Sequence, residues 1–568
     1  MGVKHFYLWY SRHFVDCLSA TPQVPVDVLA LDLNGLFHPV AQKVFQYGNY
    51  APPPSYLNKG RRPSSNVTPN MFQLFREVCE KIEFCRKICK PRKKLVLCVD
   101  GVAGMGKMNQ QRQRRFRTAK AVAEANQSFN PNAFTPGTKL MDHLTKYIDW
   151  YVRTMMSYSA EWKDLEVIFS NEKVPGEGEH KIMHYIRKHG VITDSYCIYG
   201  MDADLMMLGM VLPVEKVLIA REPEEGFVQF VDVRSFKKEI LQLMRWPSGS
   251  TAHPTTTFSE KDAVHDFIVL CFLVGNDFLP TIPSLTIMDG GIDKMMTLYK
   301  DLGKKNGHLT MEVRGKKTMK LRLEPLREFF KELGSTEKEM IEAKYNGMKN
   351  FHEDPLVLQN LDADKKLDME KFKIDYYEKN FPTGVTRKEI VHRFLDGMQW
   401  TLTYYKIGIA DWTWFFPYMY GPFLSDFTEY IPSYKHAKFE INQPVPPFLQ
   451  LMAVLPSSSA DLVPTGLSEL MTQTDSPLLQ FYPTEFEVDL AGKKRDWEAI
   501  VLLPPIDVDR FMTEYQKHVR NVTPNLLRRN MIGKNFVYLH DRSNPPQVFV
   551  SFYGNIEQCT VKVQPIVF

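Results

Sequence analysis

The chain has 568 residues, more than the ~250–300 residues that one hydrophobic core usually organises, so at least two packed lobes are expected. A hydrophobic fraction of 44% and an aromatic fraction of 12% exclude an intrinsically disordered chain. The formal net charge of +5, from 71 basic and 66 acidic residues, neither favours nor excludes a nucleic-acid partner. The distribution of charge along the chain is therefore more informative than its sum.

The eight cysteines form no CxxC pair, and the cluster Cys79, Cys85 and Cys89 has no histidine partner. Reduced thiols are therefore expected rather than a zinc site or disulfides. No apolar run approaches the ~20 residues of a membrane span, and the N-terminus lacks the apolar region of a signal peptide. These features predict an intracellular monomer with no membrane partner. The cytoplasm is favoured because no basic import cluster is found, with the nucleus left open.

In chain order, four short apolar runs are typical of buried strands, and helical patterns at 71–90 and 138–158 lie between them. The runs are Val26–Asp32, Leu95–Asp100, Leu165–Phe169 and Tyr196–Asp202. Alternating strands and helices predict an α/β fold with a mostly parallel sheet flanked by helices. Polar segments at 47–69 and 246–258 are expected to be surface loops, and 301–322 is expected to be a hairpin.

Three of the four runs end in an aspartate, and parallel strands present their carboxyl ends at one edge of a sheet, where ligands bind. Further acids follow within VPGEGEH, YGMDADL and GNDF. The candidate cluster is Asp32, Asp100, Glu177, Glu179, Asp202, Asp204 and Asp277. If the third run continues as a strand, Asp202 and Asp204 share one face.

Clustered carboxylates repel one another unless cations are present, and hard oxygen ligands suit Mg²⁺ or Mn²⁺. Two such ions about 4 Å apart can clamp the attacking and leaving oxygens of a phosphodiester. Each acid alone has an ordinary interpretation, because Asp is common in turns and Glu favours a helix N-terminus. The combination favours a two-metal site.

A basic segment follows Asp100 directly, with six Lys or Arg and no acid over residues 101–120. Lys107, Gln111, Arg114 and Arg115 fall on one helical face, which suits a terminal phosphate better than an ordinary solvated surface. The same segment, GVAGMGK, imitates the phosphate loop of NTPases. That loop requires Ser or Thr where this chain has Met108, so an NTPase is disfavoured.

Aromatic residues offer a site for a nucleotide base. His38 lies six residues after Asp32, and residues 400–422 hold a dense aromatic run that includes Trp412 and Trp414. Such density usually marks a core. If one of the two tryptophans faces His38, the pair could sandwich a base without regard to sequence.

Together these residues resemble the XRN-type 5′→3′ exoribonucleases. The resemblance extends in order from residue 1 to about residue 515. It is carried by MGVKHFYLWYSR, LDLNGLFHP, VDGVAGMGKMNQQRQRRFR, VPGEGEHKI, YGMDADLMML, VGNDFLP and WTWFFPYMYGPFLSD. It implies a PIN/flap-nuclease-like fold in a compact member of the family.

The implied organisation is a nuclease domain over 1–300, a helical linker over 301–385, a second α-rich conserved region over 386–515 and a short β-rich segment over 516–568. The implied activity is processive 5′→3′ hydrolysis of 5′-monophosphorylated single-stranded RNA to nucleoside 5′-monophosphates, with two Mg²⁺ that Mn²⁺ can replace. The seven acids would hold the metals, and Lys107, Gln111, Arg114 and Arg115 would hold the 5′-phosphate. His38 would stack with Trp412 or Trp414, and partners among RNA-decay factors stay open.

Two alternatives are a structure-specific nuclease of the flap-nuclease group and an inactive RNA-binding scaffold. The KMNQQR helix and the WTW segment disfavour the first, and the complete acidic set disfavours the second. One departure is clear. The family usually has Pro-Arg-Ala where this chain has Gly104-Met105-Gly106, so this chain lacks that arginine beside the predicted metal site.

Overall fold

The computed structural model describes residues 2–3, 5–50, 71–125, 127–247, 257–313, 315–346, 352–493, 495 and 498–568. Most of the predicted loop at 47–69 and residues 248–256 of the loop at 246–258 lie outside this range. Among the helices described, none combines the length and the apolar character needed to cross a membrane.

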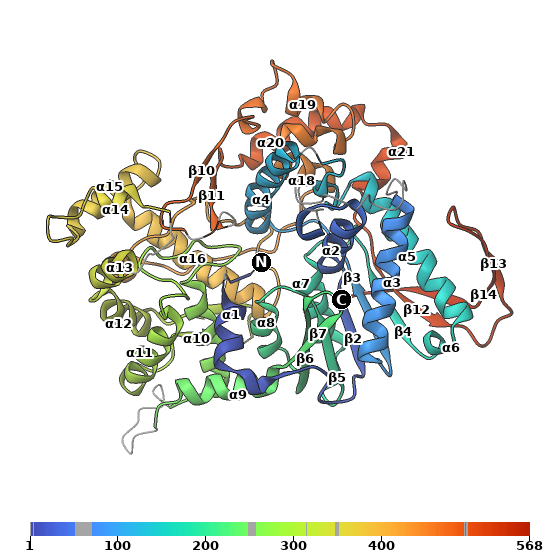
Figure 1. The fold of residues 1–568 in the computed structure, drawn as a ribbon, viewed down its shortest axis with the longest axis horizontal. Helices are drawn as coiled ribbons and strands as arrows, with labels where there is room; N and C mark the ends of the chain where they lie inside the picture. Colours follow the sequence, from blue (N-terminus) through green and yellow to red (C-terminus); the bar gives the residue numbers. More distant parts are fainter. Residues whose placement is uncertain are drawn as a thin grey trace, which may run out of the picture.

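A nine-stranded sheet forms the centre of the molecule (Figure 1), in the order β1-β7-β6-β5-β2-β3-β4-β12-β15. The strands from β6 to β4 are parallel, and those at both edges are antiparallel. This confirms the predicted α/β fold with a mostly parallel sheet. The strands are β1 (Leu18–Ser19), β2 (Val28–Asp32), β3 (Lys94–Cys98), β4 (Glu166–Ser170), β5 (Ser195–Tyr199), β6 (Lys216–Glu224), β7 (Phe227–Asp232), β12 (Asn535–His540) and β15 (Val561–Ile566).

Both faces of the sheet are covered, which explains why its central strands are apolar at nearly every position. Successive side chains of a strand point to opposite faces. Accordingly, Val28 and Ala30 of β2 belong to one hydrophobic core, and Leu29 and Leu31 belong to another. The first face is covered by α1 (Phe6–His13), α7 (Gly178–His189), α8 (Leu205–Met210), α9 (Val233–Met244) and α10 (Glu260–Phe272). The second is covered by α2 (Asn34–Phe45), α3 (Met71–Cys89), α5 (Lys139–Tyr158) and α6 (Ala160–Lys163).

A helical region continues the first core on the side of α10. Its helices are α11 (Gly291–Asn306), α12 (Leu323–Gly334), α13 (Glu337–Asn346), α14 (Pro355–Leu358), α15 (Met369–Asn380), α16 (Arg387–Lys406) and α17 (Leu424–Tyr430). The hairpin predicted over 301–322 is confirmed for its later part, where β8 (Thr310–Glu312) pairs with β9 (Met319–Leu321), but residues 301–306 belong to α11. Thr386 begins α16 by accepting a hydrogen bond from the backbone N–H of Glu389, and this helix packs against α10 and α8.

A third core joins α4 (Met105–Glu124) to segments from late in the chain (Figure 1). These are α18 (Pro447–Val454), α19 (Glu469–Thr472), α20 (Val508–His518), α21 (Pro524–Leu527) and the hairpin β10 (Glu487–Asp489) with β11 (Ile500–Leu502). The chain then returns to the main sheet, where Val537 of β12 pairs with Ile168 of β4. A last hairpin consists of β13 (Gln547–Phe549) and β14 (Ile556–Cys559).

Candidate active site

The carboxyl ends of three neighbouring strands begin the site. Asp32 is the last residue of β2, which lies between β3 and β5. Asp100 and Asp202 follow the ends of β3 and β5 by two and three residues. The backbone N–H of Asp100 donates to Oδ1 of Asn34, at 2.9 Å, which fixes the turn after β3. The predicted convergence of strand-end aspartates is therefore present.

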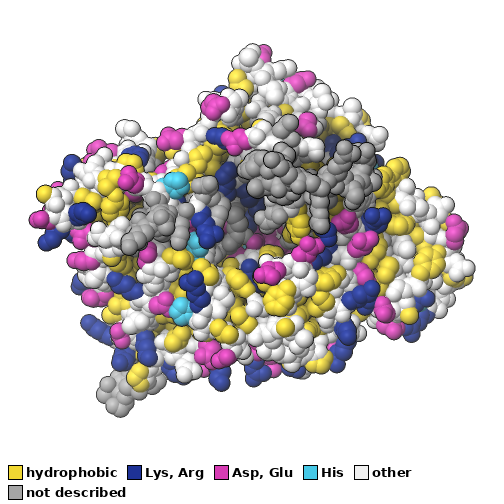
Figure 2. All heavy atoms as spheres, viewed as in Figure 1, with side chains coloured by type: hydrophobic (Ala, Val, Ile, Leu, Met, Phe, Trp, Pro, Cys, Tyr) yellow, Lys and Arg dark blue, Asp and Glu magenta, His cyan; other side chains and the backbone are white. Residues whose placement is uncertain are grey.

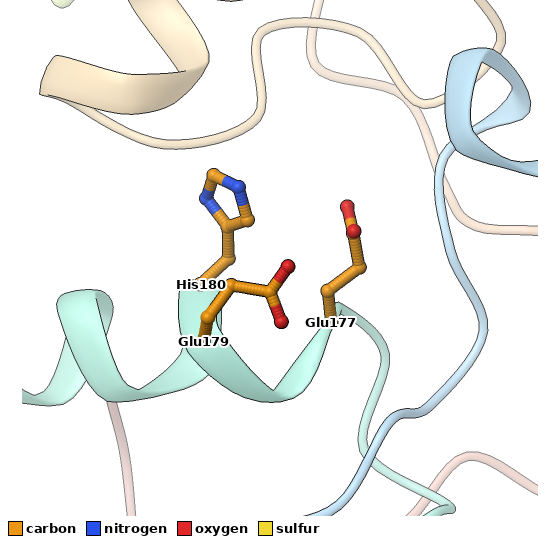
Figure 3. A group of neighbouring side chains, drawn as sticks. All are labelled: Glu177, Glu179 and His180. Carbon is orange, nitrogen blue, oxygen red and sulfur yellow. The ribbon is translucent and has the colours of Figure 1, made fainter. Parts of the chain in front are cut away.

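The glycine–glutamate motif brings two more acids to this edge because α7 begins inside it. Glu177 precedes the helix and Glu179 lies in its first turn. Figure 3 shows Glu179 and His180 on the first turn of α7 and Glu177 where the chain enters the helix. A Cβ on Gly178 would lie 2.5 Å from Oδ1 of Asp32, so only glycine permits this approach. The Gly178 N–H also donates to Oδ1 of Asp100, at 2.7 Å.

Asp202 and Asp204 reach the site by a route that differs from the prediction. The third run does not continue as a strand to Asp202, because β5 ends at Tyr199. Gly200 follows, with room for no side chain, since a Cβ there would lie 2.5 Å from Cδ1 of Leu205. Asp204 immediately precedes α8. The two aspartates are thus joined by a turn, not by the face of a strand.

Oxygen atoms of these acids lie close together. Single ligand atoms of Asp32, Asp100 and Glu179 lie within 4.8 Å of one another, as do those of Glu177, Glu179 and His180. Asp277, from the loop after α10, is linked to Glu177 through Lys107. The Lys107 Nζ lies 2.5 Å from Oε2 of Glu177 and 2.7 Å from Oδ2 of Asp277.

Burial and mutual repulsion raise the pKa of four of the acids, Asp32, Glu177, Glu179 and Asp204. Burial, and then the charges of Asp100 and Asp202, raise the pKa of Asp32 well above its usual value. Burial and the neighbouring Asp202 raise the pKa of Asp204 to about 6. Burial also acts upward on Asp277, but Lys107 outweighs it and the pKa of Asp277 is lowered. Without further positive charge, the cluster therefore retains protons near neutral pH.

The donor set fits divalent cations. Oδ1 of Asp32 and Oδ1 of Asp204 are buried and have no hydrogen-bond partner in the described part of the chain. Such buried, unpaired oxygens are costly unless a cation or a proton satisfies them. Carboxylate oxygens are the ligands that hard divalent ions prefer.

The predicted phosphate face of α4 is split between two environments. Lys107 lies in the acidic cluster, as described above. Arg115 donates from Nη2 to the Phe134 carbonyl oxygen, at 2.9 Å. The Nε of Arg115 and the Oε1 of Gln111 are buried and have no hydrogen-bond partner among the described residues. Within the residues described, Arg114 makes no hydrogen bond or ion pair. Figure 2 shows Lys and Arg side chains in a hollow near the middle of this face, at the position of α4 in Figure 1.

His38 lies beside the two arginines. Burial, followed by the charges of Arg114 and Arg115, lowers the pKa of His38 to about 3, so its imidazole is neutral at physiological pH. The His38 ring packs edge-on against Phe134, with ring centroids 5.1 Å apart. A neutral ring adds no repulsion to the arginines and suits contact with a base.

The two tryptophans differ in their surroundings. The Trp414 ring stacks on Trp400 at 5.0 Å, and its indole N–H is buried without a partner among the described residues. Trp412 is half-buried, and its carbonyl oxygen accepts from the backbone N–H of Met105, at 2.8 Å. Stacking of a base between His38 and either tryptophan stays a prediction.

Two tyrosines of α16 hold the acids and were missed by sequence reasoning. The Tyr404 hydroxyl donates to Oε1 of Glu177 at 3.0 Å, and the Tyr405 hydroxyl donates to Oδ2 of Asp204 at 2.9 Å. The His180 ring lies parallel to Tyr404, with centroids 3.7 Å apart. The only sequence signals were the aromatic run, which was interpreted mainly as core, and the position of His180 directly after the glutamates.

The departure at Gly104-Met105-Gly106 lies beneath the WTW segment. A Cβ on Gly106 would lie 3.2 Å from Cδ1 of Phe278 and 3.5 Å from the Trp414 carbonyl oxygen. Met105 is buried and begins α4. The glycines therefore bring the start of α4 close to both the loop after α10 and the segment after α16.

Comparison with known sequences gives a consistent result. A family model described as the XRN 5′-3′ exonuclease N-terminus matches residues 1–223. A second, described as the Xrn1 helical domain, matches residues 257–368 and 359–566. The chain is 29% identical to 5′-3′ exoribonuclease 1 of Homo sapiens, and the match covers all of this chain and 37% of the human protein. It is 27% identical to the 5′-3′ exoribonuclease 2 homolog of Drosophila melanogaster, covering 96% of this chain and 74% of that protein.

Among solved structures, the catalytic core of Rad2 in complex with DNA substrate covers 61% of this chain and 77% of its own. The identity is 15% and the TM-score is 0.31. Of the two sequence relatives, the chain spans little more than a third of the human protein and about three quarters of the fly protein.

Proposed function

The chain belongs to the XRN 5′-3′ exonuclease family, and on that premise we propose that it hydrolyses single-stranded RNA from the 5′ end. The main support for the proposal is that one helix, α4, contributes residues both to the acidic cluster and to the predicted phosphate site. Its Lys107 contacts Glu177 and Asp277 of the acidic cluster. One and two turns further on, buried Gln111 and Arg115 each keep a polar atom with no partner among the described residues, and Arg115 lies near His38. This arrangement supports a phosphate-holding site next to a hydrolytic one.

We propose that the acids hold two Mg²⁺ ions, which Mn²⁺ can replace. The ligands would come from Asp32, Asp100, Glu177, Glu179, Asp202, Asp204 and Asp277. When bound, such ions lower the pKa of the attacking water and stabilise the departing alkoxide. Tyr404 and Tyr405 orient Glu177 and Asp204, and Lys107 supplies fixed positive charge between Glu177 and Asp277.

We also propose specificity for a 5′-monophosphate, because the predicted phosphate residues are deeply buried. Gln111 and Arg115 are 4% and 5% exposed, so a phosphate bound to them would be shielded from solvent. Arginine binds phosphate oxygens with two parallel hydrogen bonds. A triphosphate or cap would place further charge and bulk in the same shielded site, so we expect such ends to be poor substrates.

We further propose that the strand stays bound between cuts, which makes degradation processive and releases nucleoside 5′-monophosphates. A single shielded phosphate site beside the acids supports removal of one nucleotide per cycle. The absence of a basic import cluster in the sequence supports action in the cytoplasm, in RNA decay. No second chain is required to complete the acidic cluster, which supports a monomer.

The decisive test uses three RNAs of one sequence that carry a 5′-monophosphate, a 5′-triphosphate or a 5′-hydroxyl. Each is incubated with the protein in Mg²⁺ or in EDTA, and the products are separated. Mononucleotides from the first RNA alone, and only with Mg²⁺, are expected. Internal or structure-specific fragments would indicate a flap-type nuclease, and binding without cleavage of any RNA would indicate a scaffold.

A further inference from the structure

A cavity of about 270 Å³ lies against a second face of α4. Gln110, Gln113, Arg114 and Arg117 line it at i, i+3, i+4 and i+7, which is one side of a helix. This side adjoins the face of Lys107, Gln111 and Arg115, and Arg114 belongs to both. Asp277 of the acidic cluster also lines the cavity. The cavity is therefore the immediate neighbour of the candidate active site.

The charge of the cavity walls favours an anion. Five cationic side chains line it, from four separate parts of the chain, against three carboxylates. The cations are Arg114, Arg117, Lys344, Lys379 and Lys493, and the acids are Asp277, Asp354 and Asp489. Asp277 is already paired with Lys107, at 2.7 Å. Asp489 already accepts from the Tyr420 hydroxyl, at 2.5 Å.

Two of the lysines that line the cavity, Lys344 and Lys493, repel each other. Burial, and then the charge of Lys493, lower the pKa of Lys344 to about 8. The Lys344 Nζ donates only to the Pro283 carbonyl oxygen, at 3.2 Å, and makes no ion pair with a described residue. An anion between these lysines would relieve their repulsion.

Tyrosine rings complete the lining, and the hydroxyls of Tyr376, Tyr418 and Tyr420 donate hydrogen bonds to other residues. The Tyr376 hydroxyl donates to the Gly421 carbonyl oxygen at 2.8 Å, and the Tyr418 hydroxyl to Oε1 of Glu389 at 3.1 Å. Tyr420 is held by Asp489. With their polar ends engaged, the rings offer the cavity their carbon surfaces. Cationic side chains interleaved with aromatic rings are the pattern that binds single-stranded nucleotides without regard to base.

We propose that this cavity is a second nucleotide-binding site, continuous with the candidate active site through Arg114 and Asp277, which takes one nucleoside monophosphate unit. The inference rests on the proposed function, since that supplies the nucleotide. The unit is either the released product or a nucleotide of the bound strand, and the chemistry of recognition is the same for both.

The test measures binding without hydrolysis. The full chain in EDTA is irradiated with 8-azidoadenosine 5′-monophosphate, or with a 5′-monophosphate RNA that carries 8-azidoadenosine at one chosen position. The labelled peptides are then mapped. We expect label on residues 416–420 or on Tyr376. Label from the free nucleotide alone identifies a product site, and label from the RNA identifies part of the strand's path. No label in the cavity from either probe overturns the proposal.

Variants sharpen the result. Lys344→Met and Lys379→Ala should each weaken protection by unlabelled AMP about tenfold, as for loss of one charge-assisted hydrogen bond. Lys371→Ala, an exposed lysine of the same helix as Lys379, is the matched control and should not change it. Lys379→Ala keeps the test valid if Lys344→Met does not fold, because Lys379 is exposed. Unchanged protection in Lys379→Ala would refute the site.

The proposal and the enzymatic activity fail separately. Degradation of 5′-monophosphate RNA in Mg²⁺ by the wild-type protein is followed in parallel. If the wild-type protein degrades the RNA but no label is found in the cavity, the second site is rejected and the proposed enzymatic activity stands. Labelling of the cavity without degradation retains the site and rejects the activity.

Discussion

Replacing Tyr405 by phenylalanine removes one hydrogen bond to the acidic cluster and leaves the ring in place. The Tyr405 hydroxyl lies 2.9 Å from Oδ2 of Asp204, and the two residues are 0% and 4% exposed. The other Asp204 oxygen has no partner among the described residues. Asp204 would therefore lose the donor that fixes its orientation. Hydrogen bonds to charged groups contribute about 1.5–3 kcal/mol, and loss of a residue that orients a metal ligand typically costs about 10–100-fold in metal affinity or activity.

The assay is a Mn²⁺ titration by isothermal calorimetry, with the Mg²⁺ dependence of RNA degradation measured alongside. Tyr434→Phe is the matched control, since the Tyr434 hydroxyl also donates to an aspartate, Asp396, at 2.9 Å, but outside the site. Both variants should lose similar thermal stability. Only Tyr405→Phe should bind metal at least about tenfold more weakly, and its activity should recover in part at high Mg²⁺.

Equal metal affinity in wild type and Tyr405→Phe would refute the reasoning, because the hydrogen bond would then contribute nothing to ligand geometry. An equal loss in Tyr434→Phe would refute it differently, by showing that the effect comes from general destabilisation. A loss confined to Tyr405→Phe is the expected result.

Four further outcomes are expected. Asp204→Ala should abolish Mg²⁺-dependent degradation while RNA binding in EDTA persists; unchanged turnover would remove Asp204 from the metal site. Combined Arg114→Ala and Arg115→Ala should erase the preference for 5′-monophosphate over 5′-hydroxyl RNA, and a preserved preference would move the phosphate site elsewhere. In EDTA, the raised pKa of Asp204, about 6, means that its neutral form stabilises the fold at low pH and that this contribution is lost as pH rises through about 6. As the pH rises through about 6, the melting temperature of the wild type should therefore fall relative to that of Asp204→Asn. A difference in melting temperature that does not change with pH would contradict the raised pKa of Asp204. Ending the chain at residue 530 removes β12 from its pairing with β4 and should lower the melting temperature, so an unchanged melting curve would show that β12 is dispensable.

Much of the site could be predicted because its residues lie in short sequence patterns that can be recognised without knowing the fold. Asp32 and Asp100 end apolar runs that are typical of buried strands, and parallel strands bring their carboxyl ends to one edge of the sheet. Glu177 and Glu179 stand between glycines, which signal a close approach of the backbone. Each of these inferences needs only a few adjacent residues.

The remaining features depend on packing between distant segments. Tyr404 and Tyr405 contact acids 227 and 201 residues away, and no local pattern separates them from other aromatic residues of α16. Helical periodicity predicted that Lys107 and Arg115 share a face of α4, but it could not show how deeply Lys107 is buried. Its ion pairs with Glu177 and Asp277 were therefore not foreseen. The C-terminal segment was expected to be β-rich, yet nothing in it identifies β4 as the neighbour of β12.

The hydrogen bond from Met105 to Trp412 has a consequence for how the protein is made. The first N–H groups of a helix need partners from outside it, and for α4 one such partner is specified about 300 residues later in the chain. Tyr404 and Tyr405 are translated equally late. A nascent chain therefore carries all seven acids long before it can orient them, so cutting activity is expected to appear only after the second half has left the ribosome and docked. Under the proposed function, the order of synthesis would delay RNA cleavage until these late contacts have formed.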